Sequence, residues 1–323
     1  MSDRPRLQRR TLDGVLLLDK PLGVSSNDAL VRAKFLLLAK KAGHTGTLDP
    51  LASGLLPLCF GEATKFSQDL LEADKTYEAT VRLGVRTATG DAEGEAVQTR
   101  PVECDRAALD AVLPAFRGEI AQIPPMYSAL KRDGKPLYEY ARAGEVLERE
   151  ARPVTIHSLE IIDCGLPAVP EFRMRVRCSK GTYIRTLGED IGERLGCGAH
   201  LSALRRTGVG ALTLDAAIGL GALEQAQPSE RDAWLQPVDV LLSTFAAVRL
   251  DPELTQRFLQ GQRIRLPQPL VPAPLLASDG DDGDDDLGGQ RVRVYEGEGR
   301  LLGTARFLEG LLAPERVIAS QAV

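Results

Sequence analysis

Apolar and polar residues alternate in four short stretches of the chain, and each stretch predicts a strand with one buried face. The two clearest runs cover residues 77–85 and 172–178, and two shorter runs cover residues 291–295 and 302–307. The last two runs follow a change of composition near residue 238, beyond which Pro, Gly and Asp become frequent. We therefore expect a separate small, β-rich domain in the C-terminal part.

A helical pattern of apolar residues covers residues 25–41, where Ser26 or Asn27 is suited to cap the first turn. Gly43 would then end this helix. Residues 41–61 contain too many Gly and Pro residues for one regular element, yet they also carry five leucines. We expect a partly buried loop of defined shape, which is the kind of segment that tends to carry function.

Caps and periodicity predict three further helices. One covers residues 105–116, although Pro114 weakens its last turn. Another begins after Thr182, which is suited to cap it, and ends at Gly196. The third is short and begins at Asp251, where the following proline favours the first helical position.

Composition divides the chain into a main domain over residues 1–240 and a small domain over residues 241–323. Within the main domain, residues 124–152 are polar and of mixed charge, which indicates an insertion. Within the small domain, residues 278–289 form an Asp/Gly run that cannot build a packed element. We expect this run to be a disordered acidic loop.

Composition also limits the class of protein. The hydrophobic fraction of 43% and the charged fraction of 26% are ordinary for a soluble globular protein. No apolar run approaches the roughly 18 residues of a membrane span, and the N-terminal part lacks a signal-peptide core. The five cysteines form no Cys-x-x-Cys pair and the three histidines show no metal-ligand spacing. We expect a cytoplasmic protein without metal.

The formal net charge of −5 argues against a nucleic-acid partner until its distribution is considered. Six of the acidic residues lie in the run at 278–289, whereas residues 171–206 carry eight Arg or Lys against four Asp or Glu. The predicted strand at 172–178 places three arginines on one face, which is either an RNA-facing stripe or a solvated face. Taken by itself, the pattern favours the solvated face. Local charge therefore permits an RNA partner without proving one.

Asp49 stands in the densest motif of the chain, Gly-His-Thr-Gly-Thr-Leu-Asp-Pro-Leu-Ala-Ser-Gly-Leu-Leu over residues 43–56. Pro50 forces Asp49 out of helical geometry, so its carboxylate is held in a fixed direction on a loop. An isolated Leu-Asp-Pro is more often a turn in which the aspartate caps backbone amides. The wider motif decides between these readings.

That motif closely resembles the catalytic signature of the bacterial tRNA pseudouridine synthase B (TruB) family, whose members modify uridine 55 in the T-loop of tRNA. Other segments agree in the same order. They are residues 14–26 (GVLLLDKPLGVSS), 75–77 (KTY), 124–129 (PPMYSA), 178–187 (CSKGTYIRTL) and 204–206 (LRR). The likeness is dense over residues 14–210 and looser beyond them. The acidic run is not expected of the family.

The resemblance implies an α+β pseudouridine-synthase fold. A mainly antiparallel twisted sheet with flanking helices would form the catalytic domain, and a small β-rich PUA-like domain would follow. The activity implied is conversion of a uridine in tRNA to pseudouridine by a monomer that needs no cofactor. The insertion, with its lysines and arginines, would clamp the T-loop and T-stem, and the target base would be flipped out of its stack.

The family motifs also imply roles for particular residues. Asp49 would be the essential carboxylate, acting at the sugar, at C6 of uracil or on the C2′ proton. Arg185 would be its ionic partner, although its alternative is a surface residue in the first turn of a helix. Tyr77 would stack on the flipped uracil and assist proton removal from C5; without the family it would be read as a core aromatic.

Four more residues are expected at the substrate. Tyr183 and Leu204 would line the uracil pocket, and His44 would contact the RNA where bases have been extruded. Lys20 would support the site. The ordinary alternatives are helix or core packing for Tyr183 and Leu204, a backbone-bonded loop residue for His44, and a solvated lysine for Lys20.

Two other function classes stay open at this point. A tRNA-folding chaperone or RNA-binding module would use the basic stretch at 171–206, and Asp49 would be incidental. A guide-RNA-dependent pseudouridine synthase would share the chemistry but act only with added RNA and proteins.

Overall fold

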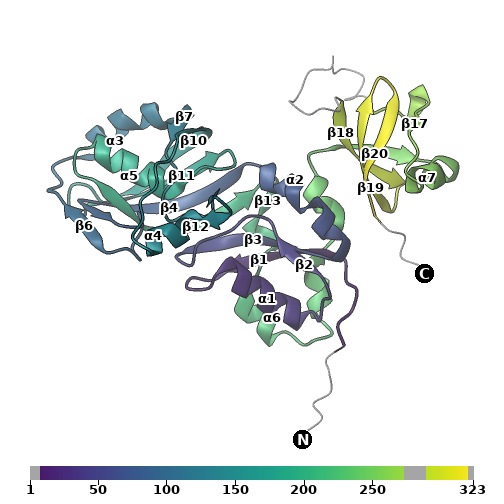
Figure 1. Ribbon diagram of the computed structural model, residues 1–323, viewed down its shortest axis with the longest axis horizontal. Helices are drawn as coiled ribbons and strands as arrows, with labels where there is room; N and C mark the ends of the chain where they lie inside the picture. Colours follow the sequence, from purple (N-terminus) through teal and green to yellow (C-terminus); the bar gives the residue numbers. More distant parts are fainter. Residues whose placement is uncertain (1–7, 273–288, 319–323) are drawn as a thin grey trace, which may run out of the picture.

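The protein is described by a computed structural model that covers residues 8–272 and 289–318. Two bodies are visible (Figure 1): a large one built on an eleven-stranded sheet and a small one built on a five-stranded sheet. Except for Gly289, the acidic run at 278–289 lies outside the described residues. Within these ranges, no helix is long and apolar enough to cross a membrane.

The strands of the large sheet are β1 (Gly14–Lys20), β2 (Ala42–His44), β3 (Ala52–Phe60), β4 (Lys75–Leu83), β7 (Gly118–Gln122), β10 (Arg152–Cys164), β11 (Glu171–Cys178), β12 (Ala199–Val209), β13 (Leu212–Thr213), β14 (Ile218–Gly219) and β15 (Leu235–Gln236). The main path runs β14-β1-β3-β12-β4-β11-β10-β7. Within the described part of this large sheet, only the pairs β1–β14 and β3–β12 are parallel, so the expected mainly antiparallel α+β sheet is confirmed.

The remaining elements flank this sheet or form the small body. The helices are α1 (Ser26–Leu36), α2 (Ser67–Glu72), α3 (Arg106–Val112), α4 (Leu137–Arg142), α5 (Ile184–Arg194), α6 (Leu220–Gln225) and α7 (Pro252–Leu259). Two short ribbons are β5 (Val85–Thr87) with β6 (Ala96–Thr99), and β8 (Lys131–Arg132) with β9 (Lys135–Pro136). The small body contains β16 (Ala246–Leu250), β17 (Ile264–Arg265), β18 (Gln290–Glu296), β19 (Leu301–Leu308) and β20 (Leu311–Val317). The 3₁₀ turns of the described residues are Gly61–Phe66, Leu113–Phe116, Leu214–Ala216, Arg231–Trp234, Val238–Leu242 and Gln268–Leu270.

The large sheet has two lobes, each with its own hydrophobic core. In the first lobe, β1 and β3 pack against α1 and α6; in the second, β4, β10 and β11 pack against α3 and α5. Strand β12 lies between β3 and β4 and joins the lobes. Tyr77 on β4 and Leu204 on β12 pack against both cores. The seam between the lobes therefore passes through two residues predicted at the substrate.

Strand β3 corrects the prediction of a loop over residues 41–61. The irregular loop covers only residues 45–51, between β2 and β3. Strand β3 begins at Ala52 and is buried along nearly its whole length. Leu56 and Leu58 face the core of the first lobe, whereas Leu55 and Cys59 face a cluster on the other side of the sheet. A strand covered on both faces shows no alternation of apolar and polar residues, so its pattern resembled a buried loop.

Helix α1 is shorter than predicted and its cap is different. The Ser25 hydroxyl accepts a hydrogen bond from the Asp28 amide, so Ser25 is the cap rather than Ser26 or Asn27. The helix ends at Leu36, and Gly43 lies in β2 instead of ending it.

The second lobe follows the predictions more closely. Strands β4 and β11 and helix α5 lie where the patterns placed them. However, Tyr183 occupies the N-cap position of α5 without a side-chain capping bond, and Thr182 donates to the Ser179 carbonyl. The last turn of the helix after Asp105 tightens to a 3₁₀ turn at Leu113–Phe116.

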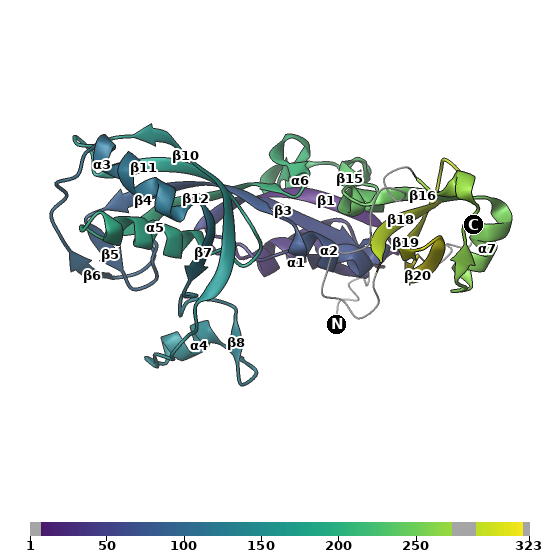
Figure 2. The ribbon, with the colours of Figure 1, turned by 90° about the horizontal axis from the view of Figure 1, so that it is seen from above.

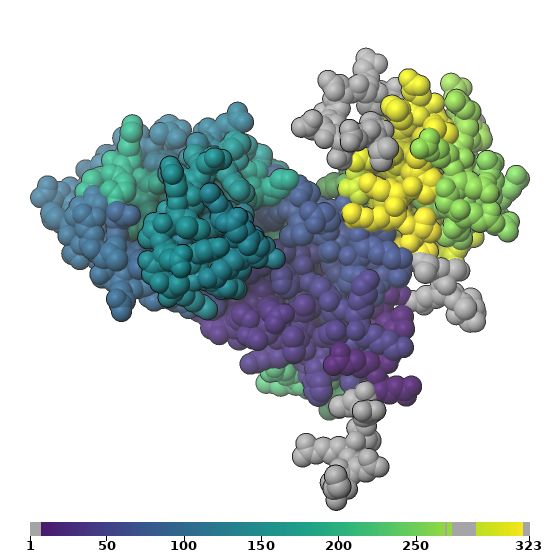
Figure 3. All heavy atoms as spheres, in the orientation of Figure 1, coloured from purple at the N-terminus to yellow at the C-terminus, as the bar shows by residue number. Residues whose placement is uncertain are grey.

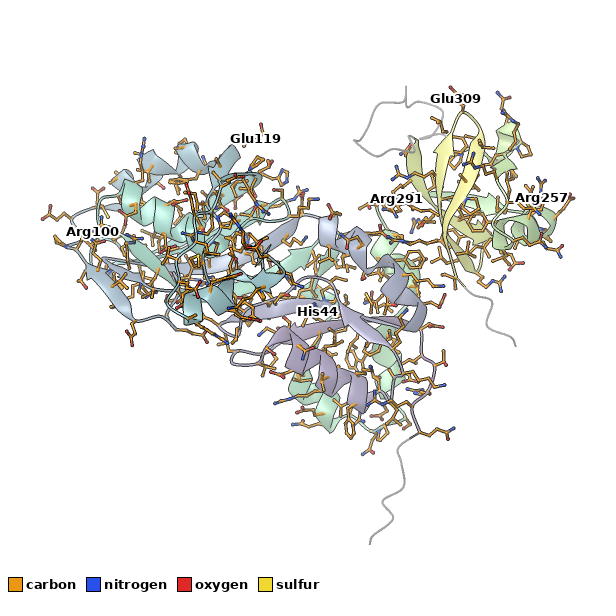
Figure 4. The ribbon with its side chains drawn as sticks, viewed as in Figure 1. His44, Arg100, Glu119, Arg257, Arg291 and Glu309 are labelled. Atoms are coloured by element: carbon orange, nitrogen blue, oxygen red, sulfur yellow. The ribbon has the colours of Figure 1, made fainter. Side chains whose placement is uncertain are left out.

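The predicted elements of the small body, α7, β18 and β19, are also confirmed. This body meets the large one beside α2 (Figure 3). Arg291 on β18 and Arg316 on β20 both pair with the buried Asp69 of α2, and Figure 4 shows Arg291 at this junction. The insertion carrying β8, β9 and α4 projects away from the sheet between β7 and β10 (Figure 2).

Candidate active site

The loop that carries Asp49 is fixed at both of its sides by the segment around the start of α1. The buried Ser26 hydroxyl accepts from the Leu48 amide at 2.8 Å and lies 3.0 Å from the Leu48 carbonyl, to which it donates. The Gly23 amide donates to the Pro50 carbonyl at 2.8 Å. Asp49 therefore stands between two anchored residues, and its side chain is 45% exposed.

Arg185 projects from the first turn of α5 and is 8% exposed. Its Nη2 lies 2.9 Å from Oδ2 of Asp49. The same guanidinium donates to the Thr89 carbonyl at 2.8 Å and to the Tyr127 carbonyl at 2.7 Å. A cation is disfavoured at the N-terminal end of a helix dipole, and here the ion pair and the two carbonyls offset that cost. The predicted pairing of Asp49 with Arg185 is present in the structure.

Asp91 is a second carboxylate on Arg185 that the sequence did not reveal. It is almost fully buried and its Oδ2 lies 3.5 Å from Nη1 of Arg185. The Glu93 amide donates to Oδ1 of Asp91 at 3.1 Å. Burial, followed by the charges of Asp91 and Asp49, raises the pKa of the Glu93 carboxyl. Residues 90–94 form a turn with two acids, and no pattern in the sequence marks which of them is buried.

A cavity of about 280 Å³ opens beside Asp49, and its lining contains five of the seven predicted site residues. They are Asp49, Tyr77, Tyr183, Arg185 and Leu204. Leu71, Lys75, Ser128 and Arg206 also line it. The structure therefore brings together residues from both lobes and from the seam, while their roles stay predictions.

Arg206 is fully buried beside Tyr77, its partner across β12 and β4. Its Nε donates to the Leu55 carbonyl at 2.8 Å, and no ion pair to it occurs among the described residues. Burial raises the pKa of the Tyr77 hydroxyl, and the charge and hydrogen bond of Arg206 oppose this. Arg206 belongs to a motif of the sequence, but its position beneath Tyr77 depends on strand pairing that the sequence does not give.

Lys20 and His44 do not line the cavity. The fully buried Lys20 ammonium donates to the carbonyls of Pro21 at 2.9 Å and Val24 at 2.6 Å. Burial lowers the pKa of Lys20 to about 8, and the nearby Asp49 opposes the shift. His44 is half-buried in β2 beside β3 (Figure 4), and burial and the charge of Arg206 lower its pKa. Both lie close enough to the site to act on its electrostatics.

The arginine stripe of β11 lies on the other face of the sheet. Arg173 and Arg175 pair with Glu78, and Arg177 pairs with Asp74. Glu78 follows Tyr77 on β4, and successive side chains of a strand point to opposite faces. The arginines are exposed and ion-paired, as expected for a solvated face.

The folds of solved proteins match this arrangement over nearly the whole chain. One match is to a structure described as a Cbf5-Nop10-Gar1 complex, with a TM-score of 0.67, 24% identity, and coverage of 97% of this chain and 87% of the other. Another is to an H/ACA RNP bound to a substrate RNA containing 2′-deoxyuridine, with a TM-score of 0.67, 23% identity, and coverage of 95% and 85%. The large body thus has the pseudouridine-synthase fold.

Sequence comparison identifies the family within the proteins of this fold. Residues 34–184 match the N-terminal domain of TruB family pseudouridylate synthases, residues 185–243 match a tRNA pseudouridylate synthase B C-terminal domain, and residues 246–318 match the pseudouridine synthase II TruB C-terminal domain. A tRNA pseudouridine synthase B of Burkholderia lata is 69% identical over 99% of this chain and 95% of its own length. One of Cupriavidus pinatubonensis is 63% identical over 97% and 96%. The chain belongs to the TruB family.

Proposed function

We propose that this protein is a cytoplasmic isomerase that converts uridine 55 in the T-loop of tRNA to pseudouridine, with Asp49 as the essential carboxylate. The observation that carries the proposal is the ion pair of Asp49 with the buried Arg185 at the edge of a cavity lined by Tyr77, Tyr183 and Leu204. The names of the relatives support tRNA as the substrate.

The reaction breaks the N1–C1′ bond, turns the uracil and joins C5 to C1′. It is redox-neutral, so side chains of this chain suffice for it and no cofactor is required. Arg185 orients the Asp49 carboxylate for attack at the sugar or at C6, or for removal of the C2′ proton. Tyr77 stacks on the uracil and assists loss of the C5 proton.

The remaining predicted residues shape the environment of the base. Tyr183 and Leu204 border the uracil, and Lys20 holds the turn that anchors the Asp49 loop through its bonds to Pro21 and Val24. His44 contacts the RNA where bases leave the stack. The target uridine is flipped out of the folded loop, at an unstacking cost of a few kcal/mol, and the insertion at residues 124–152 clamps the T-stem.

Tritium release from a T-loop RNA labelled at C5 of uracil tests the proposal. We expect Asp49→Asn to lower the rate by about 10⁴-fold or more, because no other exposed carboxylate lines the described cavity. Asp110→Asn, which removes a similarly exposed carboxylate from α3, is the matched control. Undiminished release by Asp49→Asn would refute the catalytic assignment.

The same variant separates catalysis from an RNA-folding role. A chaperone or binding module would keep its function in cells that carry Asp49→Asn, whereas full loss with this variant would identify catalysis as the function. Activity on bare tRNA as a monomer, without guide RNA or added proteins, would exclude a guide-dependent synthase.

A further inference from the structure

Arg206 lies at the seam between the two lobes, on the strand that joins them. Strand β12 places it opposite Gly54 of β3 on one side and opposite Tyr77 of β4 on the other. The approach to β3 is so close that a Cβ at Gly54 would lie 2.2 Å from the Arg206 carbonyl oxygen. The side chain is 1% exposed and lines the cavity at Asp49. The two lobes therefore fix this guanidinium at the wall of the cavity.

The guanidinium of Arg206 is buried without a carboxylate. Its Nε donates to the Leu55 carbonyl at 2.8 Å and its Nη2 to the Gly46 carbonyl at 3.5 Å. Among the described residues no ion pair reaches it, whereas the buried Arg185 has two carboxylate partners. An uncompensated buried charge is unfavourable for folding. We therefore expect this charge to serve the site rather than the fold.

Groups around the cavity respond to the charge of Arg206 in opposite ways. Burial lowers the pKa of Lys20, His44 and Lys75, and the charge of Arg206 adds to each shift. Burial raises the pKa of the Tyr77 hydroxyl, and here the charge and hydrogen bond of Arg206 oppose the shift. Arg206 thus disfavours the protonated forms of three bases and favours the ionised form of Tyr77.

Tyr77 faces Arg206 directly across two paired strands. Opposed residues of an antiparallel pair project from the same face of the sheet, with Cβ atoms about 4.5–5.5 Å apart. The ring of Tyr77 packs against the cores of both lobes, so its hydroxyl is the polar atom that the guanidinium can bind. Charges on Cys178 and Asp49 disfavour ionisation of this hydroxyl. Arg206 is placed to offset both these charges and the burial.

The last step of pseudouridine formation needs a base at C5 of the uracil. Once the freed uracil has joined C1′ through C5, this carbon still carries its hydrogen and N1 is double-bonded to C6. An ionised Tyr77 oxygen takes the proton, and the electron pair of the C5–H bond forms the C5–C6 double bond. The second N1–C6 pair moves to N1, which takes a proton from water, and Tyr77 returns its own proton to water. A neutral phenol is a poor base for this step, so the step depends on what stabilises the phenolate.

We infer that Arg206 is a positioning residue for Tyr77, whose oxygen it holds and stabilises as the anion that removes the C5 proton. The inference rests on the proposed function. It also accounts for a buried charge that the described part of the resting protein leaves without a carboxylate.

Single-turnover formation of pseudouridine by the full-length protein tests the inference, with T-loop RNA that carries hydrogen or deuterium at C5 of the target uracil. Arg206→Met removes the charge from a side chain of similar length. We expect a rate lower by about tenfold or more, and a larger C5 isotope effect than in the wild type, because proton removal becomes slow. Arg206→Lys retains the charge and should restore most of the rate.

Arg205→Met is the matched control for the isotope effect. Arg205 is the preceding residue of β12, so its side chain projects from the other face, where it pairs with Asp19. This variant should show the isotope effect of the wild type.

A double-mutant cycle separates action through Tyr77 from a structural role. In a Tyr77→Phe background, Arg206→Met should lower the rate by less than about twofold, because the oxygen on which Arg206 acts is gone. Denaturant unfolding of Arg206→Met should give a free energy equal to or above that of the wild type, since an unpaired buried charge is removed. Arg206→Gln, which keeps a donor for the Leu55 carbonyl, takes its place if the Met variant does not fold.

The outcomes distinguish this inference from the proposed function. Additive losses in the cycle, or an unchanged isotope effect in the variants without the charge, would overturn the inference while the wild type stays active. A wild type that forms no pseudouridine would overturn the proposed function, and the inference with it.

Discussion

The two lobes of the large sheet contribute different kinds of residue to one cavity. The first lobe supplies Asp49 from an irregular loop, with a side chain that is nearly half exposed. The second lobe supplies Arg185 from a regular helix, where two carbonyls and two carboxylates surround a buried guanidinium. The exposed carboxylate is open to the cavity, and the ion pair with the buried guanidinium fixes its direction.

This difference shows where the precision of the site originates. Each lobe has its own core, so neither core alone fixes the distance between Asp49 and Arg185. That distance depends on β12, which pairs in parallel with β3 and antiparallel with β4. Changes at Arg185 and at the seam should therefore have larger effects than changes on the outer face of the sheet.

The largest effect is expected for Arg185→Gln. It leaves Asp91 buried without its cation, which should lower the free energy of unfolding by about 4 kcal/mol, and it should slow pseudouridine formation about 10³-fold. Arg194→Gln, at the exposed end of the same helix, is the control for both measurements. Adding Asp91→Asn should restore stability in denaturant unfolding but not the rate. Recovery of both would show that Arg185 serves the fold alone.

A smaller loss is expected for Gly54→Ala at the seam. The residue has a φ of +103°, and an added Cβ would lie 2.2 Å from the Arg206 carbonyl oxygen. We expect a loss of about 3 kcal/mol in unfolding free energy, since the backbones of β3 and β12 must separate. Gly221→Ala in α6, where nothing lies within 4 Å of the new Cβ, should be neutral or stabilising. Equal stabilities for the two variants would contradict a tight seam.

Lys20→Met should change how stability of the first lobe depends on pH. The pKa of Lys20 is about 8 when folded and 10.5 as the ordinary value. Between these values the unfolded chain binds more protons, so the cost of burying the charge is full below pH 8 and disappears as the pH rises. By pH 9.5 the wild type should gain about 2 kcal/mol relative to Lys20→Met. Denaturant unfolding at pH 7 and 9.5 measures this, and a constant difference would show that Lys20 does not titrate in this range.

The smallest effect is expected on the outer face of the second lobe. Arg175→Ala removes an exposed partner of Glu78 and should change tRNA affinity by less than about twofold, because such pairs are weak and this face lies away from the cavity. Filter binding at two salt concentrations measures both the affinity and its salt dependence. A large loss of tRNA affinity together with a lower salt dependence would indicate that the arginine stripe faces the RNA.

The same two lobes divide what the sequence could predict. In the second lobe, β4, β11 and α5 each have one buried and one exposed face, so their periodicity is visible in the chain. In the first lobe, β3 is buried on both faces, so its residues do not alternate between apolar and polar and the sequence does not show that it is a strand. Asp49 and Arg185 were identified through family motifs, whereas Asp91 was missed because burial of one acid in a turn depends on tertiary contacts.

Helix α2 connects the small body mechanically to the cavity at Asp49. Its Asp69 holds Arg291 and Arg316 of the small body, and two residues later Leu71 lines the cavity at Asp49. The strand with Tyr77 begins at Lys75, after a connection of two residues. A rotation of the small body must therefore either break the two ion pairs of the buried Asp69 or move this short helix. The contact between the two bodies is thus coupled, through one short helix, to a residue that lines the cavity at Asp49.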